Sequence, residues 1–175
     1  MDPVAMRQFV EAALRIGHAN WDAIEELLGD EPDSSIQPLL AAIETAGLVI
    51  RDEPETVIST DSDDPVNVYI QEIGTVPRLT AAREAELLTI MQSGTRGAEI
   101  AKKDLIEANL RIPVTVARRY ANDVVHVLDL IQEGNNTLMD AVDRFDPSSG
   151  CRFSPYAYWC VRRRIQRAIS FHSFS

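Results

Sequence analysis

The sequence is poor in the residues that build metal centres and disulfide frameworks. It has two cysteines, Cys151 and Cys160, without cysteine or histidine partners close by in the sequence. Its three histidines, His18, His126 and His172, are scattered along the chain. Zinc sites need closely spaced Cys and His ligands, so the sequence predicts no metal site and no cofactor. Such cysteine usage is typical of a reducing cytoplasm.

Long apolar runs and catalytic patterns are also missing. No run approaches the roughly 20 apolar residues of a membrane span, and the N-terminus lacks a basic-then-apolar secretory signal. The chain shows no internal repeat and no glycine-rich phosphate loop. It also lacks a pattern of paired carboxylates or of a nucleophile beside a base. We therefore expect a cytoplasmic protein that is neither membrane-bound nor an enzyme.

What the chain does have is ordinary for a soluble globular protein. Its 175 residues are 45% hydrophobic and 25% charged, which allows one medium domain or two small ones. The net charge of −10 is unevenly divided: residues 1–66 carry −12 and residues 67–175 carry +2. An acidic half beside a mildly basic half suits a polyanion binder with an acidic segment. Simple solubility also explains the charge, and the charge alone favours that interpretation.

Residues 1–50 predict a small acidic module of three short helices. The first ends near Gly17, and the second runs from an N-cap at Asn20 to a stop at Gly29. The third follows a cap at 33–35 and closes at Gly47.

The chain between this module and the next helices changes character twice. Residues 48–50 are apolar and predict either a short strand or core packing. Residues 51–63 are acidic and rich in Ser and Thr, which predicts a flexible linker. Order returns with an N-cap at Asp64, Pro65 at the first helical position, and Gly74 at the end of that helix.

Further helices are predicted after this point. Thr80 caps a helix over 81–92, which completes a helical segment over 64–97. The longest predicted helix covers 98–122, and Pro113 in its middle should kink it or divide it in two.

The C-terminal part, 98–175, completes an all-α fold class. A helix begins over 124–131, is interrupted at 134–136, and resumes over 138–145. A turn at 146–150 then leads into the last helix.

That last helix combines aromatic and basic residues. Apolar residues at i, i+4, i+7 and i+8 spacing form one stripe, while Tyr156, Trp159, Arg163 and Gln166 form another. Aromatic faces stack on unpaired bases, and Arg and Gln contact phosphates or base edges. An ordinary amphipathic helix, with aromatics in the core and arginines in solvent, fits the same pattern.

The order of these segments resembles the primary-type sigma factors of bacterial RNA polymerase. DPVNVYIQEIG and VPRLTAAREAELL resemble the segment ahead of their core-binding domain. AKKDLIEANLRIPVTVARRYA, LDLIQEGNNTLMDAVDRFDPSSG and CRFSPYAYWCVRRRIQRAIS resemble that domain itself, so the match covers residues 64–170. IQPLLAAIETAGLVIRDE resembles, less closely, their acidic N-terminal module. The resemblance implies a multi-helix sigma domain 2-like bundle after the module and the linker.

The resemblance implies two partners, core RNA polymerase and promoter −10 DNA. In the family, the helix matching LDLIQEGN docks on a coiled coil at the clamp of the largest polymerase subunit. The acceptors and apolar anchors implied here are Leu128, Asp129, Gln132, Glu133, Asn135 and Met139. The same side chains also suit the solvated surface of a helix. The resemblance leaves room for an anti-sigma factor as a further partner.

The resemblance also implies DNA-binding residues. Phe145, Tyr156 and Trp159 match aromatic positions that open the −10 element and hold a flipped adenine. Asn109 and Ser154 match a second pocket for a flipped base. Stacking is worth roughly 1–3 kcal/mol per base. Phe145 and one other aromatic residue would alternatively be core residues.

Three polar residues of the last helix complete the set of implied DNA-binding residues. Arg163 and Gln166 match the two positions that read the first, still paired base of the −10 element. Arg162 adds a third polar residue to the implied DNA-binding surface.

The chain departs from the family pattern at several positions. Cys151 replaces an aromatic residue and Cys160 a second tryptophan, so we expect weaker melting. Arg163 replaces a glutamine, which favours phosphate contact over base readout. The remaining departures are Pro113, Asn136-Thr137 and Pro155. The family continues beyond residue 170 into further domains, so we expect either a fragment or a natural short form.

Two functions therefore stand side by side. The first is a sigma factor, or a part of one, that binds polymerase and recognises and helps to melt the −10 element; its acidic module would occupy the DNA channel or shield the basic helix. The second is a degenerate, truncated sigma-like protein that occupies the clamp without opening promoters. Free-standing DNA binding is disfavoured, because a charge of +2 supports few phosphate contacts.

Overall fold

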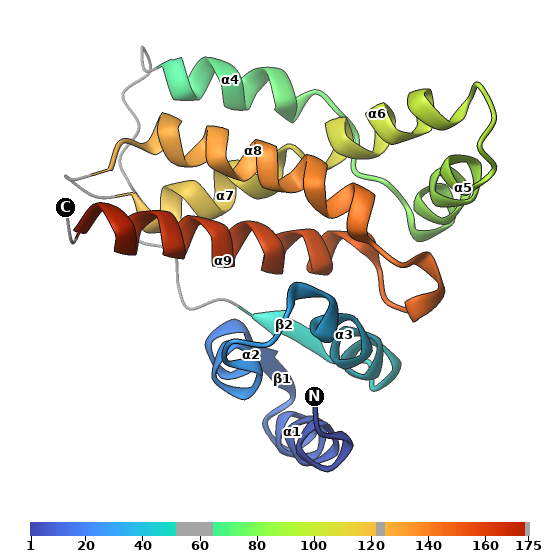
Figure 1. The fold of residues 1–175 in the computed structure, drawn as a ribbon, viewed down its shortest axis with the longest axis vertical. Coiled ribbons are helices and arrows are strands. Elements are labelled where there is room, and N and C mark those ends of the chain that lie inside the picture. Colours follow the sequence, from blue (N-terminus) through green and yellow to red (C-terminus); the bar gives the residue numbers. More distant parts are fainter. Residues whose placement is uncertain (52–64, 122–124, 174–175) are drawn as a thin grey trace. The chain divides into compact units, whose positions relative to one another are not determined.

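The computed structural model describes residues 1–51, 65–121 and 125–173. These residues are mostly helical, which confirms the predicted all-α class apart from one small sheet (Figure 1). Two compact units are present: Met1–Thr56 with Asp146–Arg152, and Val57–Phe145 with Phe153–Ser175. The predicted linker at 51–63 lies almost entirely outside the described residues.

The helices of the first unit end at or near the predicted glycines, and α2 also begins at its predicted cap. Helix α1 (Pro3–Ile16) ends at Gly17, whose φ of 89° is left-handed. Helix α2 (Trp21–Leu28) begins at Asn20, whose side chain accepts from the backbone N–H of Asp22, and ends at Gly29. Helix α3 (Ile36–Thr45) follows a 3-10 turn at Asp33–Ser35. Local cap chemistry therefore sets most of these helix ends.

A two-stranded parallel sheet pairs the segment between α1 and α2 with the C-terminal segment of this module. Strand β1 (His18–Asn20) pairs with β2 (Val49–Arg51), with His18 opposite Val49. The second strand confirms one of the two interpretations of residues 48–50, whereas β1 was not predicted. The buried apolar core of the module is Trp21, Ile24, Leu28, Ile36, Leu39, Leu40 and Ile43.

The turn at 146–152 belongs to the same unit and packs on α3. Its 3-10 turn, η2 (Pro147–Ser149), matches the turn predicted there. The backbone N–H of Asp146 donates to the side-chain oxygen of buried Gln37 at 3.2 Å. The N–H of Arg152 donates to the carboxylate of Glu44 at 3.1 Å. Two side chains of α3 thus satisfy backbone groups at both ends of the turn.

The second unit begins with α4 (Pro65–Gly74) and α5 (Ala81–Gln92). Thr80 caps α5 as predicted, accepting from the N–H of Arg83 at 3.2 Å. The expected long helix is two helices, α6 (Ala98–Asn109) and α7 (Arg111–Tyr120). Pro113 occupies the third position of α7, where a backbone N–H has no helical acceptor in any case. The proline is accommodated by division of the helix rather than by a kink.

The last two helices are α8 (Val127–Arg144) and α9 (Phe153–Ser173). Helix α8 is continuous, so the predicted interruption at 134–136 is wrong. Gly134 and Thr137 are buried within it. Tertiary packing outweighs the weak helix propensity of glycine and asparagine here.

Helix α8 lies at the centre of the second unit and packs on α6, α7 and α9 (Figure 1). Helix α7 also packs on α9 and α4, and α5 packs on α6. Lys102 of α6 bonds Asp143 of α8 at 2.6 Å, and this hydrogen bond raises the pKa of Lys102. No helix within the described ranges has the length and apolar character of a membrane span.

Candidate functional site

The predicted polymerase-binding residues lie along α8. Leu128, Gln132, Asn135 and Met139 follow i, i+4, i+7 and i+11 spacing, so they share one side of the helix. Gln132 is exposed and Met139 is 43% exposed, whereas Leu128 and Asn135 are half-buried. We call these four residues, with Asp129 and Glu133, the α8 face. It offers amide and carboxylate acceptors around an apolar anchor.

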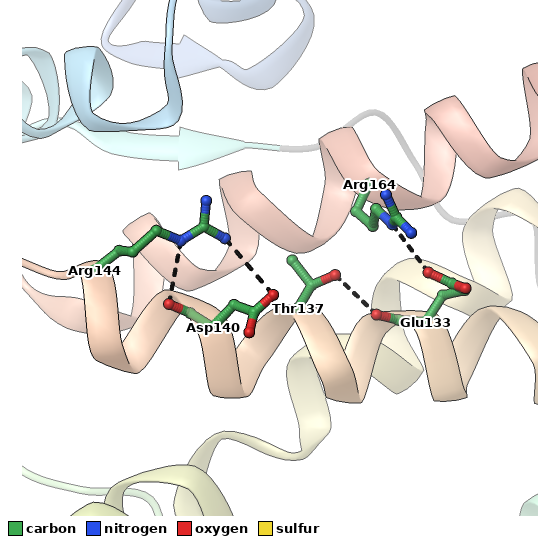
Figure 2. A network of polar contacts seen from close by, with 5 residues as sticks. All are labelled: Glu133, Thr137, Asp140, Arg144 and Arg164. Atoms are coloured by element: carbon green, nitrogen blue, oxygen red, sulfur yellow. Dashed lines mark hydrogen bonds and ion pairs between the residues drawn. The ribbon is translucent and has the colours of Figure 1, made fainter.

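Two residues of the α8 face are held by neighbouring helices. The side-chain amide of Asn135 donates to the hydroxyl of Tyr69 on α4 at 3.2 Å. Glu133 accepts from Arg164 of α9 at 2.9 Å, and both side chains are substantially exposed. Figure 2 shows Glu133 pointing toward Arg164 across the two helices, while Arg144 and Asp140 pair further along α8. The α8 face is therefore linked directly to α9.

The predicted aromatic DNA-binding residues form a buried cluster. The ring of Phe145 lies edge-on to that of Phe153, with centroids 5.4 Å apart, and 5.3 Å from that of Tyr156. Trp159 has no exposed surface, and the Arg163 guanidinium lies over its ring at 5.3 Å. Cation–π contact between residues four apart fixes both side chains on α9. The structure thus brings Phe145 and Tyr156 together and pairs Trp159 with Arg163.

A polar cluster of Tyr120, Arg162 and Gln166 lies between α7 and α9. Arg162 is 1% exposed, and its Nε donates to the hydroxyl of Tyr120 at 2.8 Å. The side-chain amide of Gln166 donates to the same hydroxyl at 3.3 Å. Arg162 and Gln166 are thereby placed side by side, one helical turn apart.

The two residues predicted for a second base pocket, Asn109 and Ser154, are in contact. Ser154, in the first turn of α9, donates to the side-chain oxygen of Asn109 at 3.2 Å. Asn109 is buried at the end of α6, and its amide donates to the carbonyl of Leu105 at 2.8 Å. Glu84 of α5 reaches the same end of α9, where it accepts from the N–H of Phe153 at 2.8 Å. Three helices far apart in sequence therefore meet at the start of α9.

Two residues of these clusters were not predicted, Glu84 and Tyr120. Glu84 is 3% exposed and shares a helical stripe with buried Leu87 and Leu88. Tyr120 lies one turn after buried Val116. A polar residue on an apolar stripe was the available sequence signal in both cases. Their partners are distant in sequence and had no such signal.

The two cysteines that replace family aromatics, Cys151 and Cys160, are both buried free thiols. They lie in different units, Cys151 in the turn after η2 and Cys160 on α9. Each therefore occupies interior volume in its own unit.

Comparisons with known proteins match this part of the chain to one family. Residues 105–173 match the family model described as Sigma-70 region 2, and residues 64–87 match Sigma-70 factor, region 1.2. The first match contains the α8 face, the cluster of Tyr120, Arg162 and Gln166, and the pair Asn109 and Ser154. The second contains Glu84.

Curated relatives of the chain are named RNA polymerase sigma factors. The chain is 47% identical over 116 residues to RNA polymerase sigma factor SigA of Lactococcus lactis subsp. cremoris, covering 66% of this chain and 32% of the relative. It is 47% identical over 110 residues to RNA polymerase sigma factor RpoS of Coxiella burnetii, covering 63% and 30%. It is 38% identical over 162 residues to SigA of Clostridium acetobutylicum, covering 85% and 41%. The chain thus spans about a third of the length of the curated relatives it matches.

Proposed function

The chain belongs to the primary-type sigma-70 family of bacterial RNA polymerase sigma factors, and we propose that it binds core RNA polymerase and recognises and helps to melt the promoter −10 element. The supporting observation is the direct packing of α8 on α9, which joins the α8 face to the clusters around Trp159 and Gln166. In this proposal the protein acts in the cytoplasm as a binding factor, and the polymerase supplies the chemistry.

Polymerase binding is assigned to the α8 face. Its exposed Asp129 and Gln132 offer an acceptor and an amide to a basic coiled coil on the largest subunit, and Met139 supplies an apolar contact. Gln132 makes a suitable probe because its side chain is exposed. Its truncation should remove an intermolecular contact with little effect on folding.

DNA binding is assigned to α9 and the residues packed beside it. Tyr156 and Trp159 are aromatic plates for unpaired bases, Asn109 and Ser154 line a second base site, and Arg163 supplies positive charge. Because Tyr156 and Trp159 are buried in this structure, base capture requires that their rings become exposed during promoter binding. Base stacking and polymerase contacts would supply the free energy for that change.

The acidic module is proposed as a separate functional part. Residues 1–51 contain nine Asp and Glu residues but three Lys and Arg residues. A module of this charge would occupy a positively charged channel of the polymerase or shield basic residues of α9. Its role depends on charge, so it should weaken as the salt concentration rises.

A titration of the chain against purified core RNA polymerase tests the proposal. We expect tight binding that Gln132→Ala weakens about 5- to 30-fold, as for an interface residue worth roughly 1–2 kcal/mol. Lys103→Ala is the matched control, because Lys103 is an exposed residue of α6 whose ion-pair partner, Glu107, lies on the same helix. Absence of binding at micromolar concentration would refute the proposal.

A second measurement separates the two functions that share this first step. A fluorescent base analogue within the −10 element should report melting when polymerase and the chain are added together. Trp159→Phe, which keeps an aromatic ring in this buried position, should weaken that signal while retaining polymerase binding. Binding of the unaltered chain without any melting would instead identify a competitor for the polymerase clamp.

A further inference from the structure

The hydroxyl of Tyr120 is shared by two side chains of α9. It accepts from Arg162 Nε at 2.8 Å and from Gln166 Nε2 at 3.3 Å. Tyr120 is the last residue of α7, and its two partners lie one turn apart on the helix packed against α7. One phenolic oxygen therefore connects two residues of the candidate DNA-binding surface.

These two contacts differ in strength. Arg162 is almost fully buried, and its bond to Tyr120 is short and charge-assisted, so it fixes the position of the phenol. Gln166 is half-buried at the edge of the cluster and makes the longer, neutral contact. The position of the Gln166 side chain therefore depends on Tyr120, and the position of the Tyr120 phenol depends on Arg162.

A fixed acceptor matters most for a glutamine. Its side chain has several rotatable bonds and loses much conformational entropy when it is ordered. Glutamine recognises adenine with its carbonyl oxygen and one amide N–H. The Gln166 carbonyl oxygen is buried in this structure, so base readout requires that this oxygen become exposed on the promoter while the other N–H stays bonded to Tyr120. A glutamine already held in place loses less freedom when it binds a base edge.

We propose that Tyr120 is a positioning residue that orients the Gln166 amide for readout of the first base pair of the −10 element. Arg162 anchors the phenol and thereby contributes to specificity from a buried position. This inference depends on the proposed function, because it assumes that Gln166 meets promoter DNA. It adds a residue of α7 to the specificity determinants of the site.

Base discrimination by the complex of core polymerase and the full chain tests this role. Duplex fragments carrying each of the four base pairs at the first −10 position are titrated, and the ratio of the best to the other affinities is measured. Tyr120→Phe removes the hydroxyl alone. It should lower this ratio at least threefold, toward the value for Gln166→Ala, and the double variant should lose no more than Gln166→Ala.

Tyr69→Phe is the matched control, because the Tyr69 hydroxyl likewise accepts from a side-chain amide, that of Asn135, but on α8. It should leave the discrimination ratio unchanged. An equal loss of affinity for all four base pairs in Tyr120→Phe would mean a purely structural role and would overturn the inference. Full discrimination in Tyr120→Phe beside a loss in Gln166→Ala would overturn it too, while leaving the proposed function intact.

A measurement on the chain without polymerase separates the remaining outcomes. The Gln166 side-chain amide resonances should shift in Tyr120→Phe and stay in place in Tyr69→Phe, which verifies the contact itself. Unchanged resonances in Tyr120→Phe would overturn the inference even if that variant cannot be assayed on DNA. If Gln166→Ala retains full discrimination, Gln166 is not the reader, and both the inference and that part of the proposed function fail.

Discussion

Gly134 of α8 lies directly against Pro113 of α7. A Cβ built on Gly134 would come within 2.8 Å of the Pro113 Cβ and 3.2 Å of its Cα, and 3.3 Å from a methyl of Val161. Real Cβ atoms essentially never come within 3.0 Å of another heavy atom, and the Cβ of a proline ring cannot rotate away. Pro113 divides the long helix, and Gly134 was expected to interrupt α8. The two residues therefore form one close contact where α7 and α8 cross.

Gly134→Ala should destabilise the protein even though alanine favours helices. The extra methyl overpacks the crossing, and we expect a loss of about 1–3 kcal/mol in the free energy of unfolding. Urea denaturation measures this change. Gly74→Ala is the control, because a Cβ there meets nothing within 4 Å. Equal stability of the two variants would contradict the close contact.

Glu84 should be required for the start of α9. Glu84→Ala leaves the buried N–H of Phe153 without its acceptor, which costs about 1–3 kcal/mol. Glu84→Gln retains an acceptor oxygen and should lose less. Thermal unfolding and hydrogen exchange at the Phe153 amide measure both effects.

Glu86→Ala is the matched control for Glu84, since Glu86 is an exposed partner of Arg83 on the same helix. We expect a change within about 0.5 kcal/mol. Exchange at Phe153 that is equally slow in Glu84→Ala and in the unaltered chain would show that the carboxylate does not hold this helix end.

Removing Arg164 and removing Glu133, which form an ion pair, should affect polymerase affinity differently. The side chains of Arg164 and Glu133 are 57% and 40% exposed, so the pair contributes at most about 1 kcal/mol to folding. Arg164→Ala leaves Glu133 available to a basic partner, so polymerase affinity should stay the same or rise. Glu133→Ala should lower it. Polymerase titration at two salt concentrations measures the affinity of both variants. A similar loss of affinity in both would contradict the expectation that Arg164 competes with the polymerase for Glu133.

The stability of the turn before α9 should depend on the negative charge of Asp146. The hydroxyl and backbone N–H of Ser148 donate to its carboxylate and hold its pKa below the ordinary value of 3.8. A lowered pKa stabilises the folded state above the unfolded pKa, and this contribution disappears as the pH falls through the folded pKa.

An NMR titration of the Asp146 carboxyl measures this effect. We expect a midpoint below 3.8 that rises in Ser148→Ala. Ser149→Ala is the control, because the Ser149 hydroxyl donates to the backbone carbonyl of Asp146 and not to the carboxylate. A midpoint that is unchanged in Ser148→Ala would contradict the hydrogen bonds from Ser148 to the Asp146 carboxylate.

Much of the fold was predictable because its signals are local. Asn20, Gly29 and Thr80 mark helix ends by hydrogen bonds or backbone angles within a few residues of themselves. The sequence motifs likewise predicted the family, because a motif is a local pattern. The roles of individual site residues remain predictions, although Asn109 and Ser154 do meet across 45 residues.

Only the tertiary structure decided the rest. Gly134 weakens a helix by itself, yet α8 is continuous through it, and its missing side chain lets α8 lie directly against Pro113 of another helix. Strand β1 exists because residues 18–20 meet residues 49–51. Glu84 and Tyr120 became visible as parts of the site once their partners on α9, 69 and 42 residues away, were in place. Sequence alone determines the elements and the family, whereas contacts between distant residues determine how the elements pack, because no local pattern encodes the partner.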